Sequence, residues 1–312
     1  MLAAAHPDRP LDLLSLGETM ALVVPARPEP LEEAEDFRLT IGGAESNVAC
    51  HLASAGHRTA WCSALGEDAL GRRVRRDIAA HGVDVQHVRL DPHAPTGLYL
   101  KDPGHGVSYY RAGSAASRMG PAELARLDLS TVRIMHLSGI TLALSADCRE
   151  LVYAAIAAAH AQGALVSFDV NHRPALWRTT EEAAHEIRAA ARKADVVLVG
   201  RDEAAALWGT ATADDVRARF PDVPHLVVKD ADIEAVEFEG GRRNAVPTPR
   251  IEIVEAVGAG DAFAAGWLDG LLTGQDAAER LTRGHARAAR TLASTHDLPT
   301  PATTSPAGGA HP

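Results

Sequence analysis

The hydrophobic positions of this chain form short continuous runs that alternate with helical stretches. Runs typical of buried strands occupy residues 12–17, 59–66, 132–139, 164–170, 194–200 and 225–230. Helices are predicted at 45–56, 68–81, 145–161, 179–194, 259–273 and 276–295. Glycines end three of these helices, at Gly56, Gly82 and Gly163, and the pair Gly240–Gly241 predicts a hairpin.

Strands that alternate with helices and are apolar throughout indicate a mainly parallel sheet covered on both faces. The pattern therefore predicts an α/β fold with a mainly parallel central sheet and helices on both sides of it. We expect one domain over residues 11–298, with loose termini at 1–10 and 299–312, where the sequence is rich in Ala, Pro, Gly and Thr.

Two segments depart from this alternation. Residues 18–41 and 94–113 contain the strand-like pieces MALVVP, DFRLTIG, TGLYLKD and VSYYRAG without helices between them. We expect these pieces to pair into a small antiparallel sheet beside the main one. Because ligands of open α/β folds sit at the carboxyl ends of the strands, such a sheet would act as a lid.

Charge and composition narrow the possible partners. The 312 residues include 31 Lys and Arg and 41 Asp and Glu, a formal net charge of −10, which argues against a general nucleic-acid binder. No apolar run reaches the roughly 18 residues of a membrane span, and residues 1–10 have no basic segment typical of a secretory signal. The three cysteines lie far apart, which favours a reducing cytoplasm and no disulfide framework.

The stretch with the clearest chemistry is VGAGDAFAAG at 257–266, where a strand enters a Gly-Ala-Gly turn and a helix follows. Gly258 and Gly260 allow a tight turn whose N–H groups attract anions. Amides that hold a γ-phosphate beside Asp261, which would accept a hydroxyl proton, suit phosphoryl transfer. A carboxylate at a helix N-terminus is also expected to have a lowered pKa. Taken alone, a GxGD pattern is more often an ordinary tight turn with the Asp as a helix cap.

A second stretch, IGGAESNVACHLASAG at 41–56, places Gly42 and Gly43 before a helix and Asn47 in its first turns. A Gly-Gly turn allows a ligand to approach the backbone, and Asn can both donate to and accept from hydroxyls. A simple strand-to-helix connection with a capping Asn explains this stretch equally well.

In this order and together, the two stretches resemble the glycine motif and the GAGD motif of the ribokinase-like (PfkB) carbohydrate kinases. The resemblance covers residues 12–297. It implies the ribokinase-like α/β fold with a β-sheet lid, and ATP as the phosphoryl donor. It also implies that Asp261 is the catalytic base, that Gly258, Ala259 and Gly260 form the anion hole, and that Gly42, Gly43 and Asn47 contact the sugar.

Within the family, GETMAL (17–22), GLYL (97–100), YYRAGSAASR (109–118) and DVNHRPALW (169–177) resemble members that phosphorylate 2-keto-3-deoxygluconate. This resemblance assigns five substrate-binding positions: Tyr99, Tyr109, Arg111, Arg173 and Asp297. An arginine fork fits the carboxylate of a sugar acid. The plainer alternatives are aromatic packing on a lid strand for the tyrosines and surface charge for the arginines.

The resemblance also bears on the nucleotide side. GRDE at 200–203 resembles the family's Asn-x-x-Glu, so Glu203 is expected to act indirectly on Mg²⁺, while Gly200 replaces the Asn. KDADIEAVEF at 229–238 has Ala231 and Glu234 where glycines are common, which leaves Lys229 as the expected nucleotide contact. Glu255-Ala256-Val257 replaces the family's Asp-Thr-Thr, so a monovalent-cation site is uncertain.

The expected reaction is ATP-dependent phosphorylation of the terminal hydroxyl of 2-dehydro-3-deoxygluconate. Alternatives are a kinase of 2-ketogluconate, 5-dehydro-2-deoxygluconate or fructose, and a non-catalytic sugar-binding relative, which would not need Asp261. Exposed edges of the lid sheet also favour a homo-oligomer, such as a dimer joined strand to strand.

Overall fold

The computed structural model describes residues 10–251, 253–254, 257–294 and 298. Residues 1–9 and 299–312, which cover the expected loose termini apart from Pro10, lie outside the described residues, as do Glu255, Ala256 and Asp297. Among the residues that are described, no helix is long and apolar enough to cross a membrane.

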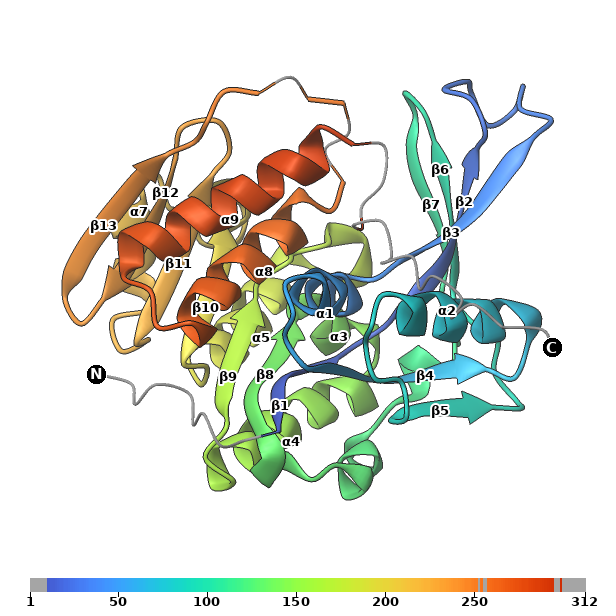
Figure 1. Cartoon of the computed structure of the whole chain (residues 1–312), viewed down its shortest axis with the longest axis horizontal. Coiled ribbons are helices and arrows are strands. Elements are labelled where there is room, and N and C mark those ends of the chain that lie inside the picture. The colour runs from blue at the N-terminus through green and yellow to red at the C-terminus, as the bar shows by residue number, and fades with distance from the viewer. Residues whose placement is uncertain (1–9, 252, 255–256, 295–297, 299–312) are drawn as a thin grey trace, which may run out of the picture.

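A nine-stranded sheet forms the body of the molecule, in the order β13-β12-β11-β10-β9-β8-β1-β4-β5 (Figure 1). The strands from β11 to β5 pair in parallel, and the hairpin β12–β13 adds two antiparallel strands at one edge. Its strands are β1 (Leu11–Leu16), β4 (Thr59–Gly66), β5 (Val88–Asp91), β8 (Val132–Ser138), β9 (Leu165–Asp169), β10 (Val196–Gly200), β11 (His225–Asp230), β12 (Glu234–Glu239) and β13 (Arg242–Pro247).

Helices cover both faces of this sheet (Figure 1). One layer comprises α1 (Ala44–Ser54), α2 (Ala69–Ala80), α8 (Ala259–Leu272) and α9 (Ala277–Leu292). The other comprises α3 (Gly139–Leu144), α4 (Ala146–Ala161), α5 (Thr180–Ala191), α6 (Arg201–Trp208) and α7 (Ala213–Arg219). Single 3₁₀ turns complete the chain at Ala116–Arg118, Pro121–Arg126, Leu129–Thr131 and Pro174–Leu176.

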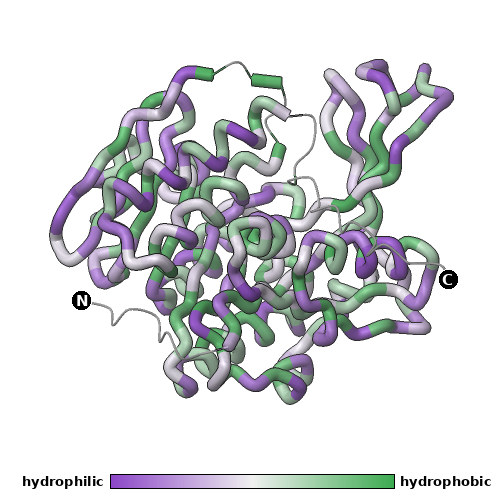
Figure 2. Tube along the Cα trace, in the orientation of Figure 1, coloured by the Kyte–Doolittle hydropathy of each residue, from purple (hydrophilic) through white to green (hydrophobic). Residues whose placement is uncertain are grey.

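The alternation of side chains along each strand explains why two cores form. Leu13 of β1 packs under α1 and α8, whereas Leu14 and Leu16 pack on the opposite layer. Hydrophobic positions accordingly concentrate in the central strands and the inward faces of the helices (Figure 2). The predicted helices and strands are all present. The sequence pattern missed β5 and the short helices α3, α6 and α7.

A separate four-stranded sheet stands beside the body, in the order β3-β2-β6-β7 (Figure 1). It consists of β2 (Met20–Pro25), β3 (Phe37–Gly42), β6 (Leu98–Asp102) and β7 (Gly106–Tyr110). The expectation of an antiparallel sheet is wrong for its central pair, because β2 and β6 run in parallel. The chain leaves the body twice, each time as an outward strand followed by a returning one, and the two outward strands are neighbours.

Candidate active site

A cavity of about 1320 Å³ lies at the carboxyl ends of the parallel strands, against the small sheet. The structure brings nearly all the site residues expected from the sequence to its wall: Gly42, Gly43, Asn47, Tyr99, Tyr109, Arg111, Arg173, Glu203, Lys229, Gly258, Ala259, Gly260 and Asp261. The one exception, Asp297, lies outside the described residues.

The turn before α8 forms one end of the cavity. Gly258 has φ 79°, a left-handed conformation that favours glycine, and it caps the helix. The first intrahelical hydrogen bond runs from the Ala262 N–H to the Gly258 carbonyl. The N–H groups of residues 259–261 therefore have no acceptor inside the helix, which makes this wall suited to an anion.

Asp261 lies in the first turn of α8, and its Oδ2 accepts a hydrogen bond of 2.8 Å from Asn47 Nδ2 of α1. Burial raises its pKa to about 7, and the neighbouring Asp169 adds to the shift, while Asn47, Lys229 and Arg173 oppose it. The expectation of a lowered pKa is wrong, because loss of hydration outweighs the helix N-terminus. A carboxylate with a pKa near neutrality is a better proton acceptor than an ordinary Asp.

Asn47 is placed by the glycine turn that precedes α1. A Cβ at Gly43 would lie 2.5 Å from the Glu18 carbonyl oxygen, and one at Gly42 would collide with the Tyr99 hydroxyl, so both positions exclude larger side chains. Asn47 is 4% exposed, and its Oδ1 has no hydrogen-bond partner among the described residues. A buried unpaired oxygen in a cavity wall is suited to a ligand hydroxyl.

The small sheet contributes a stack of side chains. The rings of Tyr99 and Tyr109 lie 5.7 Å apart with 25° between their planes, and the Arg111 guanidinium lies 5.6 Å from the centre of the Tyr109 ring. Tyr99 is buried, whereas Tyr109 is 46% exposed. The stack joins β6, β7 and the segment that follows β7 into one wall.

Arg111 is not a free cation. Its Nε donates a 2.7 Å hydrogen bond to Glu18 Oε2, and its Nη2 also contacts that oxygen. Ser114 donates to Glu18 Oε1 at 2.7 Å, and the Glu18 side chain is fully buried. Glu18 was not predicted as a site residue from the sequence, although it lies in the GETMAL segment directly after β1.

Arg173 approaches the cavity from the loop that follows β9. Its side chain is 48% exposed, and its shortest described ion-pair distance is 4.0 Å, from Nη1 to Glu203 Oε1. Beside it, Asn171 Oδ1 and His172 Nε2 are buried without hydrogen-bond partners among the described residues. Asn171 has φ 37°, so the loop also holds a non-glycine residue in a left-handed conformation.

Three charged side chains meet below the Gly258 turn. Lys229 Nζ lies 3.2 Å from Asp169 Oδ2. Burial lowers the pKa of Lys229, but the negative charges of Asp169 and Glu203 raise it by a larger amount, so the pKa is raised overall. Burial raises the pKa of Glu203, whose two oxygens accept backbone N–H groups of Gly200 and His172 at 2.8 and 2.9 Å. No role was assigned to Asp169 from the sequence, although it lies in the predicted strand 164–170 and begins the segment DVNHRPALW.

The carboxylates of the cavity suit a magnesium ion held mainly by phosphate and water. Glu203 and Asp169 already have protein partners, and no trio of described residues around this cavity forms a cation cage. Mg²⁺ usually binds through one or two carboxylates together with substrate phosphates. The donor set therefore fits such an ion, and the indirect role expected for Glu203 stays a prediction. Of the expected monovalent-cation segment, Glu255 and Ala256 lie outside the described residues.

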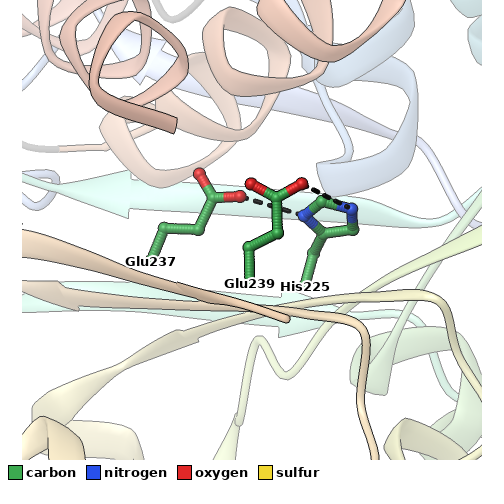
Figure 3. Close-up of side chains that lie close together, drawn as sticks. All are labelled: His225, Glu237 and Glu239. Atoms are coloured by element: carbon green, nitrogen blue, oxygen red, sulfur yellow. Dashed lines mark hydrogen bonds and ion pairs between the residues drawn. The ribbon is translucent and has the colours of Figure 1, made fainter. Parts of the chain in front are cut away.

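One cluster elsewhere has the composition of a metal site. His225, Glu237 and Glu239 lie together on β11 and β12 (Figure 3). Arg280 of α9 donates to Glu237 Oε1 at 2.6 Å and to Glu239 Oε2 at 2.7 Å, and the Trp267 indole donates to Glu237 at 2.9 Å. A guanidinium thus balances these carboxylates, and we interpret the cluster as a buried ion-pair network.

In the segment 229–238, where the nucleotide is expected to bind, a non-glycine residue adopts a left-handed backbone conformation. Ala231 has φ 39°, a conformation that costs a non-glycine residue roughly 1 kcal/mol. Its carbonyl accepts a 3.0 Å hydrogen bond from the Thr248 hydroxyl. Ala231 therefore adopts a backbone conformation that favours glycine, at one of the two positions where the sequence comparison expected glycine.

Comparison with known proteins agrees with this arrangement. A 2-dehydro-3-deoxygluconokinase of Bacillus subtilis is 33% identical over 304 residues, which cover 92% of this chain and 91% of that protein. The crystal structure of a PfkB protein from a Polaromonas species superposes with a TM-score of 0.84 at 36% identity, covering 90% of this chain and 95% of the other. A fructokinase from Xylella fastidiosa with bound ATP gives a TM-score of 0.82 at 26% identity, covering 92% and 95%.

The family model for pfkB carbohydrate kinases matches residues 11–301, which include both glycine turns, the small sheet and the cavity between them. The chain belongs to the PfkB family of carbohydrate kinases.

Proposed function

We propose that this chain transfers the γ-phosphoryl group of ATP to the terminal hydroxyl of 2-dehydro-3-deoxygluconate, giving the 6-phosphate and ADP. The observation that carries the proposal is the position of Asp261. A carboxylate with a pKa of about 7 lies behind a turn of open N–H groups and within hydrogen-bond distance of Asn47, in a cavity that Arg111 and Arg173 also line.

The geometry suits an in-line transfer. The N–H groups at Gly258, Ala259 and Gly260 bind the transferring phosphoryl group and its developing charge. The sugar hydroxyl forms the new oxygen–phosphorus bond as the bond to ADP breaks, and Asp261 accepts the hydroxyl proton. Lys229 adds a fixed positive charge beside Gly260.

The sugar occupies the part of the cavity between α1 and the small sheet. Gly42, Gly43 and Asn47 contact its hydroxyls there, and the tyrosines of the stack lie over it. From the sequence, Asp297 is a further contact. Arg173 and the remaining edge of Arg111 bind the carboxylate, because an acid that leaves water needs charged partners.

Magnesium fits this scheme as a companion of the nucleotide. When bound, it neutralises charge on the β- and γ-phosphates. In this chain Glu203 would support it from the end of β10, with phosphate and water as its other ligands. Every proton transfer in the scheme takes place on the Asp261 side chain.

A neutral ketose such as fructose is the second candidate. One observation favours it: Glu18 already neutralises Arg111, so of the two arginines assigned to the substrate carboxylate only Arg173 remains available. A fructokinase is also among the similar structures.

The test is a coupled assay of ADP formation over a substrate panel. It compares 2-dehydro-3-deoxygluconate, its C4 epimer, 2-ketogluconate, 5-dehydro-2-deoxygluconate and fructose, with sugar-free ATP hydrolysis as the blank. We expect kcat/KM for 2-dehydro-3-deoxygluconate to exceed that for fructose by at least about tenfold, the scale of one net charge-assisted hydrogen bond. A preference for fructose would overturn the sugar-acid assignment, and turnover of none of these compounds would overturn the kinase assignment.

A further inference from the structure

The charged group below the Gly258 turn contains a residue whose function is not yet accounted for. Asp169, the last residue of β9, is 4% exposed and lines the cavity. Its Oδ2 lies 3.2 Å from Lys229 Nζ, and its Oδ1 accepts the Asn171 N–H at 3.3 Å. Asp169 is therefore held by the loop after β9 while it binds the lysine.

The strand order explains how this contact forms. β10 lies between β9 and β11, so the Lys229 side chain must cross the end of β10 to reach Asp169. The residue opposite Lys229 in the β10–β11 pairing is Gly200, which has no side chain. The end of β10 is thus left open for the lysine.

The lysine also has a defined position relative to the anion-binding turn. A Cβ placed on Gly260 would lie 3.7 Å from Lys229 Nζ, so the ammonium group lies against that glycine. The charged groups that act on the ammonium are Asp169, Glu203 and Asp261. Only Asp169 has a hydrogen bond to it among the described residues.

Lys229 is partly buried, with 19% of its side chain exposed, and a lysine in such a place needs an anionic partner to keep both its charge and its position. Lysine is a flexible point charge, and desolvation without an anionic neighbour favours its neutral form. We propose that Asp169 is a positioning residue for phosphoryl transfer: it holds the Lys229 ammonium against Gly260, where a fixed cation faces the phosphoryl group. This inference rests on the proposed kinase function but not on the identity of the sugar.

A double-mutant cycle tests the proposal, using Asp169→Asn, Lys229→Met and the double variant. Removing a preorganised charge at a reacting phosphoryl group costs on the order of 100-fold in kcat, and we expect that loss for Lys229→Met. For Asp169→Asn we expect about tenfold or more, with KM for the sugar changed by less than about twofold. If Asp169 acts through the lysine, Asp169→Asn has little further effect in the Lys229→Met background. Losses that multiply instead would overturn the proposal.

Two further measurements keep the test decisive. The affinity for a fluorescent ATP analogue without sugar should fall in both single variants and no further in the double variant, whichever sugar is the substrate. In thermal unfolding, Lys229→Met should be less stable than wild type, because the buried Asp169 carboxylate loses its partner. Adding Asp169→Asn should restore part of that stability. Unchanged nucleotide affinity in both single variants, or no rescue, would contradict the proposal.

The matched control is Asp195→Asn. Asp195 lies directly before the start of β10, at the end of the strand opposite to the cavity. Its carboxylate accepts the Val166 N–H at 2.8 Å and pairs with His160. Like Asp169 it is a hydrogen-bonded carboxylate of the large sheet, but it does not line the cavity. We expect it to leave kcat and nucleotide affinity within about twofold of wild type, and an effect as large as that of Asp169→Asn would show that the measured loss is general.

Discussion

Charged side chains gather near both ends of the parallel strands of the large sheet, and the two groups differ in how many hydrogen-bond partners they have. Near the ends where the parallel strands begin, Glu237 is fully buried and receives hydrogen bonds from His225, Trp267 and Arg280. Near the carboxyl ends of the strands, Asp261 receives one described side-chain hydrogen bond, from Asn47.

The difference appears in the two carboxyl groups' proton affinities. Burial alone would raise the pKa of Glu237, but its hydrogen bonds and the Arg280 charge bring it below the ordinary value. Burial raises the pKa of Asp261 to about 7, and its partners do not compensate. The ionised Glu237 therefore favours the native state at neutral pH, and this contribution is lost as the pH falls. The ionised Asp261 disfavours it.

We interpret this contrast as the difference between a structural carboxylate and the proposed catalytic base. Both side chains are acidic and close to arginine or lysine, and neither is exposed, so composition alone does not distinguish them. Their surroundings do: Asn47 Oδ1, Asn171 Oδ1 and His172 Nε2 lack partners among the described residues, and all three residues line the cavity with Asp261. The side chains that contact Glu237, from His225, Trp267 and Arg280, have no such atom. Near Asp261 these atoms are available to hydrogen-bond a ligand.

The largest effect should follow from unpairing the structural group. Arg280→Met leaves Glu237 buried without its cation, and we expect the free energy of unfolding to fall by about 3–5 kcal/mol in urea titrations. The kcat of the folded variant should stay near wild type, because the cluster is remote from the cavity. The control is Arg192→Met, which removes an exposed ion pair with Asp222 and should cost less than about 0.5 kcal/mol. Equal losses would mean that burial of the pair is unimportant.

Arg111 and Arg173 should respond differently to substitution. Arg173→Gln should lower kcat/KM for 2-dehydro-3-deoxygluconate by about 30- to 1000-fold, roughly 2–4 kcal/mol, with a smaller effect on fructose. Arg111→Gln should impair both sugars, because it also leaves Glu18 buried without its partner. Steady-state kinetics with both substrates checks this. If Arg173→Gln weakens acid and neutral sugars in equal proportion, the carboxylate contact is wrong.

The pH dependence of catalysis should reveal the raised pKa of Asp261. Because Asp261 accepts a proton only when ionised, kcat/KM should fall about tenfold per pH unit below pH 7 and level off above it. The hydrogen bond from Asn47 opposes the shift, so Asn47→Ala should move the midpoint to higher pH. Nucleotide affinity measured at each pH removes the titration of ATP itself. A profile that is flat from pH 5 to 8 would rule out a base with this pKa.

The smallest effect concerns the backbone. Ala231→Gly relieves a left-handed alanine and should stabilise the protein by up to about 1 kcal/mol in urea unfolding. Ala245→Gly in β13 is the control, because Ala245 is not among the described residues with positive φ, and glycine there should destabilise by about 0.5–1 kcal/mol. If Ala231→Gly destabilises as much as the control does, the turn carries no strain.

The sequence predicted the elements with strong local patterns. Apolar strands and glycine-terminated helices lie where expected, and Gly258 and Gly43 occupy turns whose geometry requires small residues. Helices as short as α3 and α7 give too few turns for a clear period. The parallel pairing of β2 with β6 depends on how two distant excursions meet, which no local pattern encodes.

The sequence predicted most of the residues that line the cavity but not the contacts between them. Glu18 and Asp169 were missed because their importance comes from Arg111 and Lys229, which are distant in sequence. The direction of the Asp261 pKa shift was wrong because burial of this side chain in the folded chain is a tertiary effect that outweighs the local helix terminus. Motifs thus located the proposed catalytic base, and only the fold revealed its proton affinity.

The most direct test of this account is Asp261→Asn, measured for turnover and for unfolding in the same preparation. We predict that kcat falls by at least about 100-fold while sugar binding persists. Because ionisation of Asp261 disfavours the native state, the variant should gain stability relative to wild type as the pH rises from about 4 to 7, and be at least as stable at pH 8. Near-normal turnover, or a large loss of stability at pH 8, would show that Asp261 is another structural carboxylate like Glu237.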